Sequence, residues 1–346
     1  MILSAGLGSR LRPLTADLPK PLVPILNRPL LWYLIASLRA AGIHEIIINL
    51  HYRGEQIRSW LGGGERLGVE VAYSQESELL GSAGGVRRVR DFFGHEPGLI
   101  IHGDILFDVD LRAVIQYHLS RNAHATVVLH LAHHRYSYGV IRVNAQGHIG
   151  QFVDQQAPWV SGPLIDTVFT GVQILDPAVL DAIPVECVAT LTADVYPQLL
   201  ARAWRFYGYV IQGYWSDLGT PRRYWEANMD VVSGRVTPAG ITLQDGIHPA
   251  APHQRAWCTS NHVQPAVMLG IEAAVAGDAC IGPEVILGQG CRVADGAHIV
   301  QSVLWPRVHV EAGVTIEGSI ITNDITIPAG SRLVGKIVSA SGITDL

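Results

Sequence analysis

The C-terminal part of the chain places an apolar residue at about every sixth position, and few folds can accommodate such a period. Small residues often follow four positions later, as at Ala279, Cys291 and Ala297. A repeat this short cannot bury its own apolar side chain, so successive repeats must stack around a common core. We therefore predict a parallel β-helix over residues 275–346, with its apolar residues in columns. The series is Val275, Ile281, Leu287, Val293, Ile299, Leu304, Val310, Ile316, Ile321, Ile327 and Leu333, with Leu304 slipped by one position.

Residues 236–274, which precede these repeats, have the composition of a linker. They include several prolines, Gly240, Gly246 and the polar run Asn261–Gln264. Such residues favour turns and irregular structure. We predict a linker here that ends in an irregular first coil, which leaves residues 1–235 as a separate domain.

Residues 1–235 alternate helical and extended patterns. A helical pattern over Leu30–Ala41 ends at Gly42, and the apolar run Glu45–Leu50 follows as a buried strand. This alternation predicts an α/β domain with a mainly parallel, Rossmann-like sheet covered by helices on both faces. Ligands of such sheets bind beyond the carboxyl ends of the strands. Further strands are expected at Val69–Tyr73, Leu99–His102 and Thr126–Leu131.

The composition excludes several classes of function. Of the 346 residues, 48% are hydrophobic and 16% are charged, as in a globular protein with a large core. A net charge of −5 gives no basic surface for nucleic acid, and no apolar segment is long enough to cross a bilayer. We expect a cytoplasmic protein with small-molecule substrates. Its cysteines lack CxxC spacing, which favours reduced structural thiols: Cys187, Cys258, Cys280 and Cys291.

The first strand is unusually short, because only Met1–Leu3 precede a glycine-rich loop. Strands are commonly about five or six residues long. We hypothesise that the natural start lies upstream of Met1, which mass spectrometry of the native protein would test.

The glycine-rich loop has the composition of a phosphate-binding site. Gly6 and Gly8 give the backbone access to positive φ and close approach, so its N–H groups can point at phosphate oxygens. Ser9 adds a hydroxyl, and the planar guanidinium of Arg10 suits a triphosphate. Lys20 lies between two prolines and would act as a compact point charge. The combination favours a phosphate site over the alternative, an ordinary glycine turn with exposed cations.

This loop differs from two common glycine motifs and matches a third. Gly6–Leu11 lacks the third glycine of the dinucleotide fingerprint, and no Gly-Lys-Ser/Thr completes a P-loop. Gly6–Thr15 followed by Pro19–Pro21 instead resembles the signature of sugar-phosphate nucleotidyltransferases, Gly-x-Gly-Thr-Arg-Leu-x-Pro-Leu-Thr with Pro-Lys-Pro, with Ser9 in place of threonine. The resemblance covers most of residues 1–235 and is strongest to the mannose-1-phosphate guanylyltransferase branch. The repeats resemble the left-handed hexapeptide-repeat β-helix that many members append.

The resemblance implies a metal site formed by two aspartates. Asp104 follows the strand that ends near Ile101, and Asp217 lies in Gly213–Thr220; the matching aspartates bind the metal in the family. One or two carboxylates completed by phosphates and water are usual Mg²⁺ ligands, so Mg²⁺ is the expected cofactor. Asp108 and Asp110 fit better as turn or helix-capping residues. The resemblance also makes Arg10 and Lys20 catalytic and assigns nucleotide binding to Leu3, Ala5, Gly6, Gly8 and Ser9.

A second glycine-rich segment resembles the family's base-binding segment. It contains Gly81, Ser82 and Ala83, whose small side chains would let a flat base lie against the backbone. Glu76 stands where relatives contact the base edge. A carboxylate only accepts hydrogen bonds, which suits the adjacent donors of guanine and favours GTP, whereas uracil or thymine would suit an amide. The alternative for Glu76 is a solvated loop charge.

Three further segments match those that line the sugar pocket in relatives. They imply that Gly139, Asp154, Thr170 and Gly171 bind the sugar. The family usually has Val-Glu-Lys-Pro at the second segment, with the lysine on the sugar phosphate, whereas this chain has Gln155. Either another cation binds the phosphate, with Arg142 and Arg222 as candidates, or the sugar is unusual.

The reaction implied by the resemblance is nucleotidyl transfer from a nucleoside triphosphate to a sugar 1-phosphate, giving an NDP-sugar and pyrophosphate. GTP with mannose 1-phosphate is the expected pair, and UTP or dTTP with another hexose phosphate is the alternative. Gln155 would favour a different class, a non-catalytic sugar-nucleotide-binding regulatory subunit. Acyl transfer by His298 or His309 is a weaker alternative, because single histidines in such repeats are typically surface residues. The repetitive β-helix surface predicts a homo-oligomer.

Overall fold

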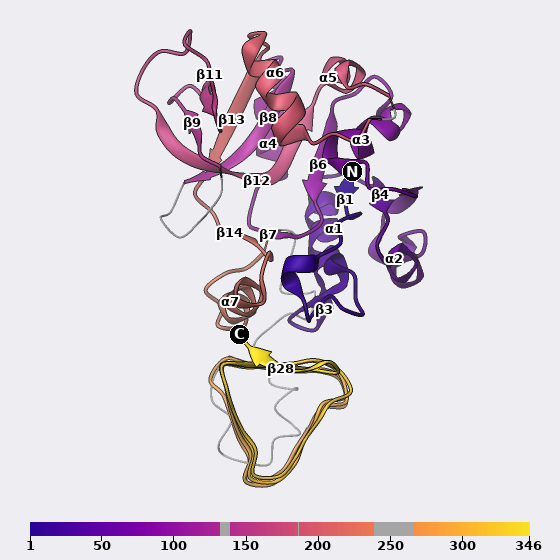
Figure 1. Ribbon diagram of the computed structural model, residues 1–346, viewed down its shortest axis with the longest axis vertical. Helices are drawn as coiled ribbons and strands as arrows, with labels where there is room; N and C mark the ends of the chain where they lie inside the picture. Colours follow the sequence, from indigo (N-terminus) through magenta and orange to yellow (C-terminus); the bar gives the residue numbers. More distant parts are fainter. Residues whose placement is uncertain (132–138, 186, 239–265) are drawn as a thin grey trace. The chain divides into compact units, whose positions relative to one another are not determined.

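The chain folds into two compact units that do not follow sequence order. The computed structural model describes residues 1–131, 139–185, 187–238 and 266–346. The first unit comprises Met1–Leu7 and Leu34–Asp217, and the second comprises Gly8–Tyr33 and Leu218–Leu346 (Figure 1). Most of the expected linker, together with Cys258 and Tyr138, lies outside the described residues. The domain boundaries expected from the sequence stay a prediction.

A ten-stranded sheet forms the centre of the first unit. The half of the sheet that contains the first strand is parallel: Ile2 of β1 pairs with Ile48 of β4 and with Ile101 of β6, and β5 continues the sheet beyond β4. The strand order is β11-β10-β9-β12-β6-β1-β4-β5, with β8 pairing β12 and β13 pairing β8. The strands are β1 Ile2–Leu3, β4 Glu45–Leu50, β5 Glu70–Gln75, β6 Gly98–His102, β8 Ala125–Leu131, β9 Ile141–Val143, β10 Ile149–Phe152, β11 Gln155–Gln156, β12 Ile165–Leu175 and β13 Phe206–Ile211.

The expectation of a mainly parallel sheet needs correction outside that half. Strand β12 runs antiparallel to β6, β8 and β9, and β10 runs antiparallel to both β9 and β11. The whole sheet is therefore mixed. A buried strand has the same apolar pattern in either direction, so the sequence pattern did not reveal the reversal.

Seven α-helices lie in the described part of the chain. The helix expected over Leu30–Ala41 is observed at Leu30–Ala40 and is followed by Gly42, whose φ is 89°. The expected strands agree with the observed ones to within about two residues at each end, the usual uncertainty of such boundaries. The helices are α1 Leu30–Ala40, α2 Gly54–Leu61, α3 Gly81–Arg88, α4 Leu111–Ser120, α5 Pro177–Ala182, α6 Tyr196–Ala201 and α7 Pro221–Val232.

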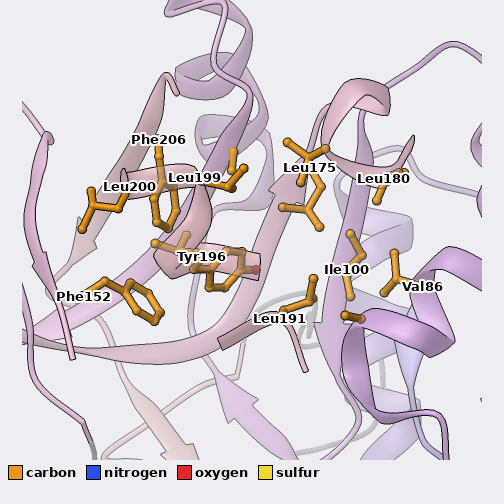
Figure 2. Packing of buried hydrophobic residues seen from close by; sticks show 14 of the residues in the cluster. Val86, Ile100, Phe152, Leu175, Leu180, Leu191, Tyr196, Leu199, Leu200 and Phe206 are labelled. Atoms are coloured by element: carbon orange, nitrogen blue, oxygen red, sulfur yellow. The ribbon is translucent and has the colours of Figure 1, made fainter. Parts of the chain in front are cut away.

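Tyr196 of α6 lies within the core of the first unit (Figure 2). Its ring is fully buried, with ring centroids 5.3 Å from Phe152 and 5.1 Å from Phe206. Its hydroxyl donates a hydrogen bond to Oε1 of Gln173 on β12. A buried tyrosine needs such a partner for its polar end, so this contact fixes α6 against the sheet.

The C-terminal repeats form the predicted parallel β-helix. Three stacks of strands make its sides, and in Figure 1 the coils overlie one another as a triangle. The strands of each stack are parallel, except that Gly342–Asp345 ends the first stack antiparallel to Lys336–Ser339. Every residue of the predicted apolar series is buried in one cluster, and Val275, Val293, Val310 and Ile327 stand in register as one column. The strands are β15 Val267–Leu269, β18 Val285–Leu287, β21 Val303–Leu304, β24 Ile320–Ile321, β27 Lys336–Ser339 and β28 Gly342–Asp345 in the first stack, β16 Ala274–Val275, β19 Arg292–Val293, β22 His309–Val310 and β25 Thr326–Ile327 in the second, and β17 Cys280–Ile281, β20 His298–Val300, β23 Thr315–Glu317 and β26 Arg332–Val334 in the third.

Helix α7 joins the β-helix to the N-terminal segment of the second unit. The buried hydroxyl of Tyr224 donates to the carbonyl of Pro24 (2.6 Å) and accepts from Nε1 of Trp305 (2.9 Å). Asn228 Oδ1 accepts from the N–H of Leu26 (3.3 Å). The N-terminal segment also bonds the coils directly, because Asn27 Nδ2 donates to the carbonyl of Leu287 (2.9 Å). The segment that contains Arg10 and Lys20 therefore packs with the C-terminal part of the chain.

Candidate active site

The structure brings the two predicted metal ligands together at the edge of the sheet. Strand β6 ends at His102, and Gly103 and Asp104 lead directly into β7 (Ile105–Phe107). Strand β7 pairs antiparallel with β14 (Trp215–Asp217), and in this register Asp217 lies opposite Ile105. Asp217 is buried, and Asp104 is half-buried. Although they are far apart in the sequence, the two residues are therefore brought to adjacent strands, with Asp104 one position before the partner of Asp217.

This pair fits Mg²⁺ as a substrate-linked ion. Within the described ranges no group of three or more potential ligand residues is found, so Asp104 and Asp217 would supply only part of a coordination sphere. Mg²⁺ usually binds one or two carboxylates and completes its six positions with substrate phosphates and water. Asp110, by contrast, caps α4 by accepting from the N–H of Ala113 (3.1 Å), as expected for a capping residue.

The same edge carries the start of the glycine-rich loop. The N–H of Gly103 donates to the carbonyl of Leu3 (2.8 Å), and a side chain at Gly103 would meet Oγ of Ser4 at 2.6 Å. Leu3 ends β1 half-buried, and Ala5 is buried beyond it. Within the first unit, the loop thus leaves the sheet next to the turn that carries Asp104.

The second unit holds the rest of the loop. Gly8 has a φ of 62°, as predicted, and its carbonyl accepts from Oγ1 of Thr15 (2.7 Å). A Cβ at Gly8 would lie 3.3 Å from Thr15 and 3.4 Å from Lys20, so glycine is needed there for space as well as conformation. Gly6 is exposed and does not have a positive φ, which corrects that expectation.

The two predicted cations lie in different environments. Arg10 is exposed, together with Ser9, in the single turn Ser9–Leu11. Lys20 is only 8% exposed and opens the turn Lys20–Leu22 between two prolines. A buried ammonium interacts more strongly with a phosphate than an exposed one, because less water screens it.

Glu76 is neither a solvated loop charge nor exposed toward a ligand. It is 1% exposed, and Oε1 accepts from Nδ2 of Asn49 (2.7 Å) while Oε2 accepts from the N–H of Leu80 (3.1 Å). The alternative that Glu76 is a solvated loop charge is therefore wrong. Because the chain itself supplies a donor to both carboxylate oxygens, the argument for guanine from this residue also loses its basis.

The start of α3 is occupied by a neighbouring segment of the chain. Ala189 accepts from the N–H groups of Ala83 (2.9 Å) and Gly84 (3.3 Å), and a Cβ at Gly81 would meet its carbonyl oxygen at 2.3 Å. Oγ of Ser82 accepts from the N–H of Leu191 (2.8 Å). The small residues therefore serve close packing within the protein, and base binding by Gly81, Ser82 and Ala83 stays a prediction.

The residues predicted to bind sugar are only partly accessible. Thr170 is buried, and its hydroxyl donates to the carbonyl of Val128 (2.8 Å), so it is used inside the sheet. Gly171 has a φ of 90° and packs against His102. Gly139 and Asp154 are exposed. A sugar role for Gly139, Asp154 and Gly171 stays a prediction, and the hydroxyl of Thr170 is not available for it.

Both cations considered as substitutes at Gln155 already have acidic partners. Arg142 pairs with Asp166 (2.9 Å) and Arg222 pairs with Glu226 (3.1 Å). Gln155 itself lies on β11 and donates to the carbonyl of Gln156 (3.1 Å). A sugar-phosphate role for Arg142 or Arg222 therefore stays a prediction, and either arginine would have to exchange its acidic partner for the phosphate.

We did not predict the contact of Asn49 with the start of the glycine-rich loop. Asn49 is 3% exposed near the end of β4, and its Oδ1 accepts from the N–H of Ser4 (2.7 Å). An amide within the otherwise apolar run Ile46–Leu50 was the available signal, because a buried polar side chain needs a partner.

Two pockets lie away from these residues. One, of about 330 Å³, is in the first unit and is lined by Trp159, Trp204 and Tyr207, among others. The other, of about 540 Å³, is in the second unit and is lined by Leu18, Trp305 and their neighbours. Neither pocket includes Asp104, Asp217, Arg10 or Lys20.

Comparison with known proteins is consistent along the whole chain. Residues 1–234 match the family model "Nucleotidyl transferase", and residues 263–344 match "GMPPB C-terminal domain". The UTP--glucose-1-phosphate uridylyltransferase of Synechocystis sp. is 32% identical over 98% of this chain and 86% of its own. A probable mannose-1-phosphate guanylyltransferase 2 of Oryza sativa is 30% identical, covering 96% and 88%, and the Mycobacterium tuberculosis mannose-1-phosphate guanylyltransferase is 29% identical, covering 92% and 82%.

Solved structures agree on the fold. HddC from Yersinia pseudotuberculosis superposes with a TM-score of 0.56 at 24% identity, covering 66% of this chain and 96% of that one. Among the described residues, no helix has the length and apolar character needed to cross a membrane. The family match and the relatives agree, and the chain belongs to the nucleotidyl transferase family as a sugar-1-phosphate nucleotidyltransferase with a GMPPB-type C-terminal domain.

Proposed function

We propose that this enzyme transfers the guanylyl group of GTP to mannose 1-phosphate with Mg²⁺, giving GDP-mannose and pyrophosphate. The observation that carries the chemistry is the β7–β14 register, in which Asp217 lies opposite the residue after Asp104. The choice of substrates is supported by the match of residues 263–344 to a GMPPB C-terminal domain and by guanylyltransferases among the relatives.

In this reaction an oxygen of the sugar phosphate attacks the α-phosphorus of the nucleotide. One P–O bond forms, the bond to the β-phosphate breaks, and pyrophosphate leaves with the electron pair. Asp104 and Asp217 would hold Mg²⁺, which when bound supplies positive charge to the reacting phosphates. Arg10 would bind the outer phosphates, and the buried Lys20 would stabilise charge at the reacting one. Positioning and charge neutralisation suffice, so no covalent enzyme intermediate is required.

Uridylyl transfer to glucose 1-phosphate is the second candidate. The uridylyltransferase relative is as similar to this chain as the guanylyltransferases are, and Glu76 does not favour guanine. The two candidates share the site chemistry and differ only in substrates.

Pyrophosphate release across a matrix of nucleoside triphosphates and sugar 1-phosphates, with Mg²⁺, tests this proposal. We expect turnover with GTP and mannose 1-phosphate, and a loss of about 10²-fold or more in Asp104→Asn, since a metal ligand is removed. Asp108→Asn is the matched control, because it removes an exposed carboxylate four residues later. A preference for UTP and glucose 1-phosphate would select the second candidate. If no pair released pyrophosphate while sugar nucleotides raised the melting temperature of the protein, the result would instead indicate a regulatory subunit.

A further inference from the structure

Each polar backbone and side-chain group of Glu76 has a hydrogen-bond partner. Its N–H donates to the carbonyl of Leu50 (2.8 Å), and Nδ1 of His51 lies 3.0 Å from its carbonyl oxygen. The two carboxylate oxygens accept from Asn49 and from the N–H of Leu80. So complete a set of partners around a buried carboxylate indicates a fixed structural position.

Asn49 extends this set of hydrogen bonds to the glycine-rich loop, which is the predicted phosphate site. Its Oδ1 accepts from the N–H of Ser4 at 2.7 Å, while its Nδ2 donates to Glu76 at 2.7 Å. The hydrogen bonds therefore run from Ser4 through Asn49 and Glu76 to Leu80, and we call these four residues the relay. Ser4 begins the glycine-rich loop, and Leu80 directly precedes α3. All four residues lie in the first unit.

The relay works only with this arrangement of donors and acceptors. Glu76 receives two donors, and an ionised carboxylate is the side chain that only accepts. Asn49 must accept at one end and donate at the other, as an amide does. A glutamine at position 76 would have one acceptor for two donors, so one N–H would always face another N–H.

Helix α3 packs directly on the centre of the relay. A Cβ at Gly85 would lie 2.9 Å from Oε1 of Glu76 and 3.0 Å from Nδ2 of Asn49. Gly85 is buried, so an added methyl group there would have to displace the helix or one of these two side chains. Glycine at this position lets the helix lie against the Asn49–Glu76 hydrogen bond.

We propose that Asn49 and Glu76 are positioning residues that hold the phosphate loop and the start of α3 in a fixed relation. This inference deepens the proposed function, on which it rests. The relay contacts the loops and not the nucleobase, so its loss lowers nucleotide use by a similar factor for every nucleoside triphosphate. A residue that read the base would instead change the preference among them.

The test exchanges the carboxylate of position 76 and the amide of position 49. Glu76→Gln should lower kcat/KM for the nucleotide by about tenfold or more, because one buried donor loses its acceptor. Asn49→Asp alone places two carboxylates face to face and should be similarly impaired. In the double variant, the new carboxylate at position 49 accepts from Ser4 and from the new amide at position 76. The oxygen of that amide accepts from Leu80, so the relay is complete again. We expect kcat/KM of the double variant to return to within about threefold of the unchanged enzyme, as a coupled pair should.

Glu78→Gln is the matched control, because Glu78 is an exposed carboxylate two residues away. Gly85→Ala should reproduce the loss seen in Glu76→Gln without changing any relay side chain. Failure of the double variant to recover, or a changed ratio of GTP to UTP use in Glu76→Gln, would overturn the proposal.

Amide hydrogen exchange keeps this test independent of turnover. In the enzyme without substrates, exchange at Ser4 and Leu80 should become at least about tenfold faster in Glu76→Gln and slow again in the double variant. If no substrate pair is turned over, the proposed function fails while this measurement still decides the relay. Unchanged exchange at both amides in Glu76→Gln would refute the relay.

Discussion

At the scale of single residues, Lys20 stands out because nearly all the other basic residues of the chain are arginines. Only Lys20 and Lys336 are lysines among 25 basic residues. Lys20 is also nearly buried, whereas Arg10 is exposed. A compact ammonium fits a confined site at a reacting phosphate, and a planar guanidinium needs more room and a different geometry.

Lys20→Arg should therefore lose activity although the charge is kept. We expect kcat/KM to fall by about 10²-fold, since a misplaced charge at the reacting centre is costly. Lys336→Arg is the control, because Lys336 pairs with Asp345 (2.6 Å) on the β-helix. Pyrophosphate release by both variants measures the difference, and full activity of Lys20→Arg would contradict the assigned role.

At the scale of elements, the sequence predicted what depends on local period. The apolar series of the β-helix was correct at every residue, because each coil repeats the same constraint. The positions of the first strands were also correct, and so was the use of Asp110 as a cap. The direction of β12 was not predictable, because it depends on pairings between strands distant in sequence.

The site shows the same division between local and long-range information. Motifs predicted Asp104 and Asp217 as metal ligands, but their placement on adjacent strands depends on the β7–β14 register. The polar character of Glu76 suggested a ligand contact, whereas its partners, Asn49 and Leu80, come from two other elements. Hydrogen-bond partners separated by up to tens of residues leave no periodic signal in one sequence.

His118 gives the contact between α4 and β8 a pH dependence. Its buried ring bonds Thr126 (2.9 Å), and burial lowers its pKa to about 4, with nearby His124 acting in the same direction and Asp176 opposing. In the unfolded chain the pKa is near 6.5, so between about pH 6.5 and 4 the unfolded state takes up the proton first. The stability that depends on neutral His118 is complete above this window and falls through it.

His118→Gln should therefore flatten the loss of stability on acidification. Between pH 7.5 and 4.5 we expect the unchanged protein to lose about 2 kcal/mol more unfolding free energy than this variant, from the pKa difference. Urea unfolding at both pH values measures this, with the exposed His309→Gln as control. Equal losses in all three proteins would show that His118 does not couple to folding.

At the scale of the whole molecule, Tyr224 joins three parts of the second unit. Tyr224 lies on α7. Its hydroxyl donates to the carbonyl of Pro24 in the N-terminal segment and accepts from the indole N–H of Trp305 in the β-helix. Burial raises the pKa of Tyr224 far above its ordinary value, so the phenol stays neutral. Losing this hydroxyl would leave a buried carbonyl and a buried indole N–H without their partner.

Tyr224→Phe should thus destabilise the second unit by about 2 to 3 kcal/mol, the cost of two unsatisfied buried groups after partial relaxation. Chemical denaturation followed by tryptophan fluorescence would report it, since Trp305 is the partner. Tyr209→Phe, at a half-buried tyrosine of the first unit, should change stability by less than about 1 kcal/mol. If Tyr224→Phe left the unfolding free energy unchanged, water would have to replace the hydroxyl.

The grouping of residues 8–33 with the C-terminal half also sets how this enzyme can exchange modules with its relatives. A recombinant that took its β-helix from a relative by a single crossover near residue 235 would mismatch that helix with the segment containing Lys20, since Asn27 bonds Leu287 and α7 bridges both. Two crossovers that carried residues 8–33 along would preserve those contacts. Inheritance of the β-helix is therefore tied to the short cation-bearing segment at the other end of the gene, and the two are expected to vary together.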